Sequence, residues 1–574
     1  MQILSCPALS NNAGGGQARD MGSLMLIWLL LTSALVSAVF VLPSADAATY
    51  FVSPNGKDDN KGTNDWPWSL AQANASAEPG DAVVLLDGVY RGTPIAPARS
   101  GREGRPITYG AANVQGAVLT ESPAMPGPFP DDDSGSPAAI FLLDRSHVVI
   151  DGVAVKDPGG RFLYAGGASF ITVQNCDFEN TEYPNAWESC RFKRVGDHIT
   201  FRNNRVKKGN DSVAITGGSF HLIEGNTFES ASHTCLVLMG VQRSVVRGNT
   251  FTNPIQKLME VFTARRRDVG AVIRKSEYLV IEDNVFGPAP SIERNGTDSG
   301  SGSAGIQYAG NNSILRGNVY LKCGMGMDFS RYQAGARDDP EALYCSHNRF
   351  YNNTVYDCGW PARYGSGPGV WISGGRNGIE DNVLVNNALH RNHAHPDAHF
   401  PPSTPHDVQL AFADPNNFRM LHNLLMGREK GAVTVWNKAQ KTGFKLSAFE
   451  KQFPQTARGN LEAEPEFVDA KKGDFRLMAS SPCIDAGMSL TVTRSPGEGT
   501  VIEVEDALYF SDGHGIIGPD VLRVGKERVK VLKVDYQANA ITVSRSISWK
   551  KGDPVTLDYA GRAPDIGAFE FGSG

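Results

Sequence analysis

The sequence predicts an all-β protein, a parallel β-helix in which the chain winds into stacked coils of short strands. The first observation is a recurring phrase, an asparagine with an apolar residue three positions before it and another two positions after it. Successive copies between Asn204 and Asn382 are separated by 22 to 35 residues. The second observation is that the apolar runs are short, rich in Val, Ile and Phe, and bounded by Gly and Asn. They show no sustained helical period, which favours strands over helices.

The asparagines of the phrase are expected to occupy the same turn of successive coils. They are Asn204, Asn226, Asn249, Asn284, Asn318, Asn353 and Asn382. Cys176 and Gly152 occupy this position in two earlier coils, and Asn423 occupies it in a late coil. An asparagine there can stack on its neighbours, satisfy backbone groups and tolerate a left-handed backbone. These residues are therefore predicted to be structural rather than catalytic.

The first 47 residues are predicted to be an export signal. An apolar run begins after Met21 and ends in Ala45-Asp46-Ala47, a typical cleavage site before Ala48. Met21 is an alternative start of the chain. An uncleaved membrane anchor is the alternative interpretation, because the apolar run is long and its only nearby positive charge is Arg19. Both interpretations place the folded part outside the cytoplasm. With cleavage, we expect a secreted, extracellular or periplasmic protein without stable membrane insertion.

The overall charge argues against a nucleic-acid-binding protein. The formal net charge is −6 over 574 residues, so any basic site must be local. The chain contains eight cysteines, of which Cys6 would leave with the signal. No C-x-x-C pair is present, so buried free thiols are expected, with a Cys176–Cys190 bridge as the alternative. We expect a monomer.

The chain divides into segments of different character. Residues 48–140 are expected to form an N-terminal cap and the first coils, including a short helix around Ser69–Ala77 that covers the open end of the solenoid. Residues 141–460 form the helix core. Residues 461–499 and 561–574 are expected to close it, and 500–560, rich in alternating β residues, to form an inserted small β-subdomain.

Both ends of this chain resemble those of a known group of proteins. The relevant segments are YFVSPNGKDDNKGT (50–63), EPGDAVVLLDGVYRG (78–92), SGREGRPITYGA (100–111), EPEFVDAKKGDFRLMASSPCIDAG (464–487) and GRAPDIGAFEFG (561–572). They resemble secreted right-handed β-helix proteins related to polysaccharide lyases, including the chondroitinase B and alginate lyase group and certain pectate lyases. The resemblance implies a right-handed helix with capped ends. It is specific for fold and weak for activity, because similar ends flank lyases, hydrolases and epimerases.

The longest coils are expected to form a groove. Coils between Asn249 and Asn353 run to 34 or 35 residues and must carry loops that stand off the helix. The groove walls should come from residues 261–275, 287–303 and 330–345.

Alignment by the phrase predicts a polar column near these loops. Seven residues after three successive asparagines stand Asp211, His233 and Gln256, with Lys257 next to the last and Glu260 further along. Stacked coils place equal offsets about 4.8 Å apart. The alternative is that this column only caps a turn.

A basic segment follows the column, FTARRRDVGAVIRKSE (262–277). A lyase acting on a uronic acid must neutralise the carboxylate, remove the proton alpha to it and stabilise the resulting charge. We expect Lys257 or His233 to be the base and an arginine of this segment to bind the carboxylate. The expected catalytic residues are Lys257, His233 and Arg266, the substrate-binding residues Arg265, Arg267, Arg274 and Gln256, and the Ca²⁺ ligands Asp211 and Glu260. The alternative is a solvated loop whose arginines pair with Glu260, Asp268 and Glu277.

The predicted function is a secreted polysaccharide lyase that cleaves an acidic, uronic-acid-containing polysaccharide by β-elimination. One alternative is a polygalacturonase-like hydrolase, because GNDSVAI (209–215) precedes SHTCLVLMG (232–240) by one coil. Asn210, Ser232 and Thr234 depart from that family's acidic pair and Gly-His-Gly turn. A non-catalytic carbohydrate-binding or surface protein is the other alternative.

Two further groups of residues could contact a ligand. Histidines gather in HRNHAHPDAHF (390–400) and at His406, a density that suggests a weak transition-metal site in an exposed insertion. Trp360, Trp371 and Trp436 could form sugar-stacking platforms, although core packing is the more frequent use of tryptophan.

Overall fold

The structure is a computed structural model, and its described residues are 47–124, 137–183, 188–264, 274–289, 304–329, 345–359, 368–372, 379–392, 406–411, 417–427 and 429–572. The described residues from Ala48 onward belong to one compact unit, Ala48–Gly574. The predicted signal (1–47) and its cleavage site therefore lie almost wholly outside the described residues. Among the described residues, no helix combines the length and apolar character needed to span a bilayer.

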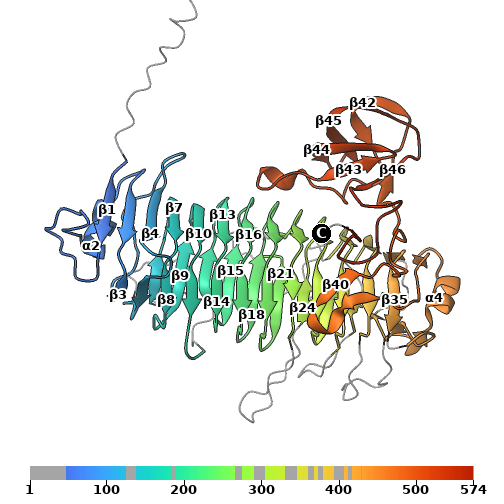
Figure 1. Ribbon diagram of the computed structural model, residues 1–574, viewed down its shortest axis with the longest axis horizontal. Coiled ribbons are helices and arrows are strands. Elements are labelled where there is room, and N and C mark those ends of the chain that lie inside the picture. The colour runs from blue at the N-terminus through green and yellow to red at the C-terminus, as the bar shows by residue number, and fades with distance from the viewer. Residues whose placement is uncertain are drawn as a thin grey trace, which may run out of the picture. The chain divides into compact units, whose positions relative to one another are not determined.

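Three β-sheets run along the described chain, and successive coils each contribute one strand to each sheet (Figure 1). In the described residues, sheet A has 14 strands: β1 (Thr49–Val52), β2 (Ala82–Leu85), β4 (Ile107–Ala111), β7 (Ser146–Asp151), β10 (Ser169–Gln174), β13 (Ile199–Arg202), β16 (Leu222–Glu224), β19 (Val245–Arg247), β22 (Val280–Glu282), β25 (Ile314–Arg316), β28 (Arg349–Tyr351), β31 (Asn382–Val385), β34 (Phe418–Leu421) and β38 (Ala457–Arg458). Sheet B, counted over the same residues, has 12: β3 (Gly88–Arg91), β5 (Ala117–Thr120), β8 (Ala154–Lys156), β11 (Asp177–Glu179), β14 (Arg205–Lys207), β17 (Thr227–Glu229), β20 (Thr250–Thr252), β23 (Val285–Phe286), β26 (Val319–Leu321), β29 (Thr354–Tyr356), β32 (Ala388–His390) and β35 (Leu424–Gly427). Sheet C, in the described part of the chain, also has 12: β6 (Ala138–Phe141), β9 (Arg161–Gly166), β12 (Glu188–Lys193), β15 (Asp211–Thr216), β18 (Thr234–Met239), β21 (Lys257–Phe262), β24 (Ala304–Tyr308), β27 (Met325–Phe329), β30 (Val370–Ile372), β33 (Val408–Leu410), β36 (Val435–Asn437) and β37 (Thr442–Phe444).

The predicted fold class, a right-handed parallel β-helix, is confirmed. Neighbouring strands in each sheet pair in parallel, as β15 and β18 do from Asp211↔Thr234 to Thr216↔Met239. The exception is the terminal strand β37, which pairs antiparallel with β36. Residues far apart in the sequence therefore become neighbours along the helix, at the spacing of adjacent strands.

An asparagine ladder lies at the turn between sheets A and B. The Oδ1 of Asn226 accepts a hydrogen bond from the backbone N of Asn204 at 2.9 Å, and the same bond recurs coil by coil. The ladder starts at Cys176, whose backbone N donates to Asn204 Oδ1, and it includes Asn423. These side chains are almost fully buried and satisfy backbone donors that would otherwise be unpaired inside the helix. The expected structural role of these asparagines is confirmed.

Two details of the ladder differ from the sequence prediction. The left-handed residue is the one before the asparagine, such as Gly225 (φ 65°) or Asp283 (φ 56°), so the ladder asparagine itself does not need that conformation. Asn382 is not the successor of Asn353, because the backbone N of Asn353 donates to Asn387 Oδ1. Asn382 instead accepts from the backbone N of Asn348 in a second ladder, at the start of a sheet A strand.

The core of the helix contains a stack of aromatic rings two residues after the ladder positions. The ring centroids of Phe228 and Phe251 are 4.8 Å apart, those of Phe251 and Phe286 are 4.9 Å apart, and those of Phe286 and Tyr320 are 4.8 Å apart. The apolar residue after each asparagine in the repeated phrase therefore builds the core. Such stacking adds about 0.5–1.5 kcal/mol per pair beyond simple burial.

A short α-helix covers each end of the β-helix. Helix α2 (Leu70–Ser76) begins at Ser69, whose side chain accepts a hydrogen bond from the backbone N of Gln72, as expected for an N-cap. Its buried residues Leu70 and Ala73 join the main core, as does Phe449 of α4 (Leu446–Gln452) at the other end. The predicted N-terminal capping helix is thus present in the structure.

Segments after the last coil pack on two of the three sheets. Strands β39 (Phe467–Asp469) and β40 (Asp474–Leu477), joined by the 3₁₀ turn η2 (Ala470–Lys472), cover part of sheet B, where Phe475 packs with Val319, Leu321 and Tyr356. A second segment then forms a six-stranded antiparallel sheet: β41 (Thr491–Val492), β42 (Gly497–Glu503), β43 (Val521–Val524), β44 (Glu527–Asp535), β45 (Ala540–Trp549) and β46 (Pro554–Leu557), with the 3₁₀ turn η3 (Gly513–Gly515) between β42 and β43. The expected boundary at residue 500 falls inside β42.

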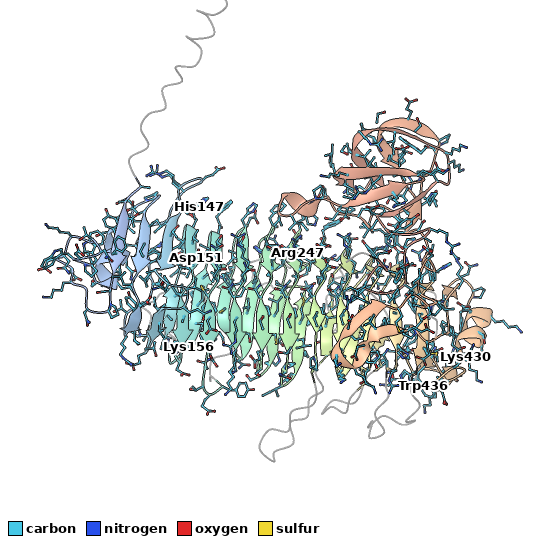
Figure 2. All side chains as sticks on the ribbon, in the orientation of Figure 1. His147, Asp151, Lys156, Arg247, Lys430 and Trp436 are labelled. Atoms are coloured by element: carbon cyan, nitrogen blue, oxygen red, sulfur yellow. The ribbon has the colours of Figure 1, made fainter. Side chains whose placement is uncertain are left out.

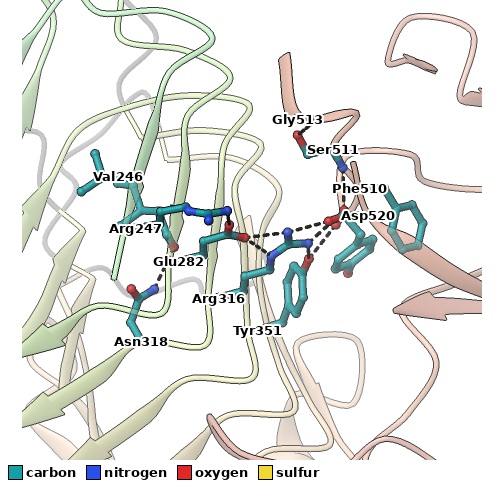
Figure 3. A network of polar contacts seen from close by, with 12 residues as sticks. Val246, Arg247, Glu282, Arg316, Asn318, Tyr351, Phe510, Ser511, Gly513 and Asp520 are labelled. Carbon is teal, nitrogen blue, oxygen red and sulfur yellow. Dashed lines mark hydrogen bonds and ion pairs between the residues drawn. The ribbon is translucent and has the colours of Figure 1, made fainter. Parts of the chain in front are cut away.

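The antiparallel subdomain is anchored to the outer face of sheet A. Its apolar residues, such as Ile502 and Val531, share one buried cluster with Val280 and Ile314 of sheet A. The Arg316 guanidinium lies between Glu282, at 2.7 Å, and Asp520, at 2.6 Å (Figure 3). Late coils of sheets A and B are therefore covered by these C-terminal segments.

All seven cysteines in the described residues are buried and free. Burial raises the pKa of the Cys176 and Cys190 thiols above their ordinary values. The expectation of buried free thiols is confirmed, and the alternative Cys176–Cys190 bridge is absent from this part of the chain.

Candidate functional site on sheet C

Sheet C presents one face to the core and the other outward. Val213, Leu236 and Met259 are fully buried in the main core, and the alternation of a β-strand sends the next residue of each strand to the outer face. One outer column thus runs Ala214, Val237, Glu260, Gln307 and Asp328 in the register of the sheet. A second outer column lies at the start of the strands.

The second column is shifted by one residue from the sequence prediction. Asp211 is paired with Thr234, and Thr234 with Lys257, rather than Asp211 with His233 and His233 with Gln256. The physical reason is turn length. Three residues separate β14 from β15, whereas four separate β17 from β18 and β20 from β21. His233 is the last residue of the first longer turn.

His233 nevertheless contacts Asp211, and a continuous polar cluster results. Its Nδ1 lies 2.6 Å from Asp211 Oδ1 and 3.2 Å from the Thr234 hydroxyl oxygen. The Thr234 hydroxyl donates to Glu260 Oε2 at 2.9 Å. Glu260 Oε1 in turn forms an ion pair with the Lys257 ammonium. These five residues, Asp211, His233, Thr234, Lys257 and Glu260, are called the acid–base cluster below.

The chemistry of the acceptors fixes the orientation of the imidazole. A carboxylate only accepts hydrogen bonds, so His233 Nδ1 carries the proton that Asp211 receives. Nε2 is then the ring nitrogen left for other chemistry. Burial alone lowers the pKa of His233, but the hydrogen bond and charge of Asp211, with the charge of Glu260, raise that pKa above its ordinary value.

The side chains of the acid–base cluster differ in solvent exposure. The Glu260 side chain is only 3% exposed, whereas the side chains of Lys257 and His233 are 24% and 28% exposed. A buried carboxylate thus supports two groups of basic character that reach the surface. A proton-accepting nitrogen beside an ammonium is the arrangement that removal of a proton next to a carboxylate requires.

Calcium does not fit the residues expected to bind it. Asp211 and Glu260 stand in different columns, and their carboxylates are engaged by His233, Thr234 and Lys257. Ca²⁺ takes six to eight oxygen ligands, whereas two cationic or potentially cationic side chains surround these carboxylates. In the described residues, no group of three or more His, Cys, Asp or Glu side chains is placed to hold a metal ion.

The remaining predicted residues are distributed differently. Arg265, Arg266 and Arg267 lie outside the described residues. Arg274 lies at the opposite end of the sheet C strands, where its guanidinium donates to Gly218 O and to the Ser219 hydroxyl, both at 2.8 Å.

Gln256 does not occupy the position in the polar column that the sequence predicts for it. Gln256 is half-buried in the turn before β21 and is not in register with Asp211. The expected groove walls (261–275, 287–303 and 330–345) fall mostly outside the described residues.

Several outer-face residues were not anticipated from the sequence. Thr234 links the two halves of the acid–base cluster, and the Gln307 amide donates to Asp328 at 3.4 Å two strands along. On the other side of the cluster, Arg191 stands one strand before Ala214 in the outer column, between the buried Cys190 and Phe192. The inward and outward alternation of side chains along each sheet C strand could have identified these residues. The asparagine phrase does not extend into those strands and does not reveal it.

The histidine-rich segment is mostly outside the described residues, which include only two of its histidines, His390 and His406. His390 Nε2 lies 3.2 Å from Glu464, and burial lowers its pKa to about 4. His406 Nε2 lies 3.2 Å from Gln409 Oε1 on sheet C.

Comparisons with known proteins agree with this architecture. A family model described as "Right handed beta helix region" matches residues 138–449, more than half of the chain. Pectate lyase L of Dickeya chrysanthemi is 32% identical over 142 residues, covering 23% of this chain and 31% of that protein. The uncharacterized protein YwoF of Bacillus subtilis (strain 168) is 31% identical over 134 residues, covering 22% of this chain and 27% of that protein. The aligned segment therefore spans about a third of the length of the curated relatives.

The chain is also similar to solved structures. The crystal structure of pectate lyase Pel9A aligns over 92% of this chain and 98% of that chain, with 16% sequence identity and a TM-score of 0.44.

Proposed function

The chain belongs to the family of right-handed β-helix proteins, related to polysaccharide lyases, and we propose that it is a secreted lyase that cleaves a uronic-acid-containing polysaccharide by β-elimination. The observation that carries this proposal is the acid–base cluster on the outer face of sheet C. The similarity to pectate lyase L supports the substrate class, an acidic polysaccharide.

In the proposed reaction, His233 Nε2 removes the proton at C5 of a uronic acid, alpha to its carboxylate. The electron pair of that C–H bond forms the C4–C5 double bond while the C4–O bond breaks, and the leaving oxygen takes a proton from water. Asp211 holds the imidazole through Nδ1 and stabilises the imidazolium that forms, and the imidazolium then returns its proton to solvent.

Lys257 supplies positive charge in this proposal. Its ammonium is paired with Glu260 and its side chain is 24% exposed, and we assign it the compensation of the charge that develops on the uronate carboxylate. Arg265, Arg266 and Arg267, which lie outside the described residues, remain proposed site residues, Arg266 as a catalytic residue and Arg265 and Arg267 as substrate-binding residues. Gln256, the residue before Lys257, and Arg274, at the opposite end of the sheet C strands, remain proposed substrate-binding residues. The proposed steps run through Asp211, His233 and Lys257, and the carboxylates of Asp211 and Glu260 are engaged by His233, Thr234 and Lys257 rather than arranged as an oxygen cage for Ca²⁺.

The experiment incubates the purified protein with pectate, alginate, chondroitin and hyaluronan, with and without calcium, and follows the absorbance of the new double bond. Absorbance that rises with one of these substrates, and does not rise with a His233→Ala variant, is the expected result. New reducing ends without absorbance would point to a hydrolase. Retained glycan binding with neither product would point to a non-catalytic binding protein, and either outcome would contradict the proposal.

A further inference from the structure

The outer column of sheet C continues past the acid–base cluster and changes in character. From Asp328 the register leads to Trp371, then to Gln409 and Trp436. Their strand neighbours, such as Val370 and Val435, are fully buried in the core, so alternation places these three side chains on the same outer face as Glu260. At about 4.8 Å per strand, Trp371 lies roughly 14 Å and Trp436 roughly 24 Å from Glu260 along the helix.

Polar and cationic groups surround the two tryptophans. The Lys438 ammonium lies over the Trp371 ring, 5.3 Å from its centroid. The His406 ring lies beside that of Trp436, with centroids 6.3 Å apart, and its Nε2 reaches Gln409 Oε1. Both tryptophans are partly exposed, and Lys438 is exposed.

We propose that Trp371, Gln409, Trp436 and Lys438 form a distal subsite that binds the acidic polysaccharide several sugar residues away from the bond that is cleaved. The proposal rests on the proposed function for its substrate class. Trp436 offers a ring for the apolar face of a sugar and Lys438 offers charge for a uronate carboxylate, while the buried Gln409 contacts the His406 ring that lies beside Trp436. Because the column is continuous with the cluster, one extended chain can contact both. Figure 2 labels Trp436 toward the C-terminal end of the helix.

A second aromatic row in the molecule lacks the geometry for this role. The row consists of His147 and Phe170, at the starts of β7 and β10, and His198 and Phe220, in the turns before β13 and β16; successive ring centroids are 4.5 to 5.4 Å apart. Each ring covers the face of the next, so no sugar can stack between neighbouring rings of the row. Trp371 and Trp436 are separated by a whole strand and do not cover one another.

The test measures equilibrium binding to pectate, alginate, chondroitin sulfate and hyaluronan in a His233→Ala background, so that no turnover is needed. Trp436→Ala and Lys438→Ala are each expected to weaken binding of the preferred long chain on the order of tenfold. Matched controls are Trp66→Ala, an exposed tryptophan of the N-terminal cap, and Lys441→Ala, an exposed lysine beside β37. The controls should bind as the parent does.

Kinetics separate this inference from the proposed function. With the active protein, Trp436→Ala should raise KM for long chains while leaving kcat and the cleavage of short oligosaccharides unchanged. Binding that is equal in the parent and both variants would overturn the distal subsite even if lyase activity is found. A parent that binds none of the four polysaccharides would also overturn it. Loss of binding in the variants without any elimination in the active protein would support the subsite and contradict the lyase.

Discussion

His233 Nδ1 lies 2.6 Å from Asp211 Oδ1, although the two residues come from successive coils and are not in register. The contact exists because His233 ends a turn that is one residue longer than the turn before Asp211. It gives the imidazole a fixed orientation and a raised pKa.

Replacement of Asp211 by Asn should shift the pH dependence of the reaction. The Asp211 charge raises the pKa of His233 against the opposing effect of burial, so its removal lowers that pKa. A base must be unprotonated, and the acidic limb of kcat/KM should therefore move to lower pH while the maximal rate falls at least about tenfold through loss of orientation. Asp197→Asn, an exposed change beside His198, is the matched control. If the acidic limb of the kcat/KM profile of Asp211→Asn stays at the parental pH, His233 is not the base.

The same pair should contribute stability in a defined pH range. The folded-state pKa of His233 is raised above its unfolded value of about 6.5, so folding binds a proton more tightly. This contribution is fully present below the unfolded pKa and is lost as pH rises through the folded pKa. Urea unfolding of the parent and His233→Ala should therefore differ more at low pH than at alkaline pH.

Replacement of Lys257 by Ala should abolish turnover while the protein remains folded. The change removes the proposed charge at the substrate carboxylate and leaves the buried Glu260 with Thr234 as its remaining partner in the cluster, at a cost of about 1–3 kcal/mol in the free energy of unfolding. Lys156→Ala disrupts a comparable pair with Asp177 on sheet B and should leave turnover unchanged. Rates and circular dichroism of both variants would be measured; a Lys257→Ala protein with parental rates excludes this residue from the mechanism.

Replacement of Asn284 by Ala should destabilise the helix strongly. The Asn284 amide donates to Val246 O and Glu282 O, and its Oδ1 accepts from the backbone N of Asn249. Loss of these buried bonds should lower the free energy of unfolding by about 2–4 kcal/mol, because each unpaired buried group carries a desolvation cost. Asn55→Ala, at an exposed position in the N-terminal cap, should change it by less than about 0.5 kcal/mol. Denaturant midpoints of the two variants provide the comparison.

Replacement of Arg316 by Met should loosen the antiparallel subdomain. The substitution leaves the buried carboxylates of Glu282 and Asp520 without their shared cation. This change should lower the free energy of unfolding by about 3–5 kcal/mol. Arg476→Met removes a similar bidentate contact to Asp474 at the surface and should cost less than about 1 kcal/mol. Limited proteolysis between residues 490 and 560 would report the difference, and equal protection of both variants would show that the buried network does not hold the subdomain.

The repeated phrase was sufficient to predict the architecture because it encodes both the ladder and the core. The asparagine satisfies the turn, and the residue two positions later supplies the aromatic stack, as Phe251 does after Asn249. The phrase assigned Asn382 to the ladder, whereas the ladder residue is Asn387. Asn387 also matches the phrase, with Leu384 three positions before it and Leu389 two positions after it.

The candidate site was predictable only in part. Offsets from the ladder brought Asp211, His233 and Lys257 into one neighbourhood, but could not place them in register, because turn length between sheets B and C varies by one residue. The role of Thr234 follows from this shift and was missed. The distal tryptophans depend on strand alternation across coils of unequal length, which no fixed offset reproduces.

The single additional amino acid at His233 shows how such a molecule could diversify. Pairing between the flanking strands is undisturbed by it, so the framework and its folding need no adjustment. Reactive side chains can thus be added, exchanged or removed coil by coil through one-residue changes in turn length. The asparagine ladder and the aromatic core continue to specify the same β-helix.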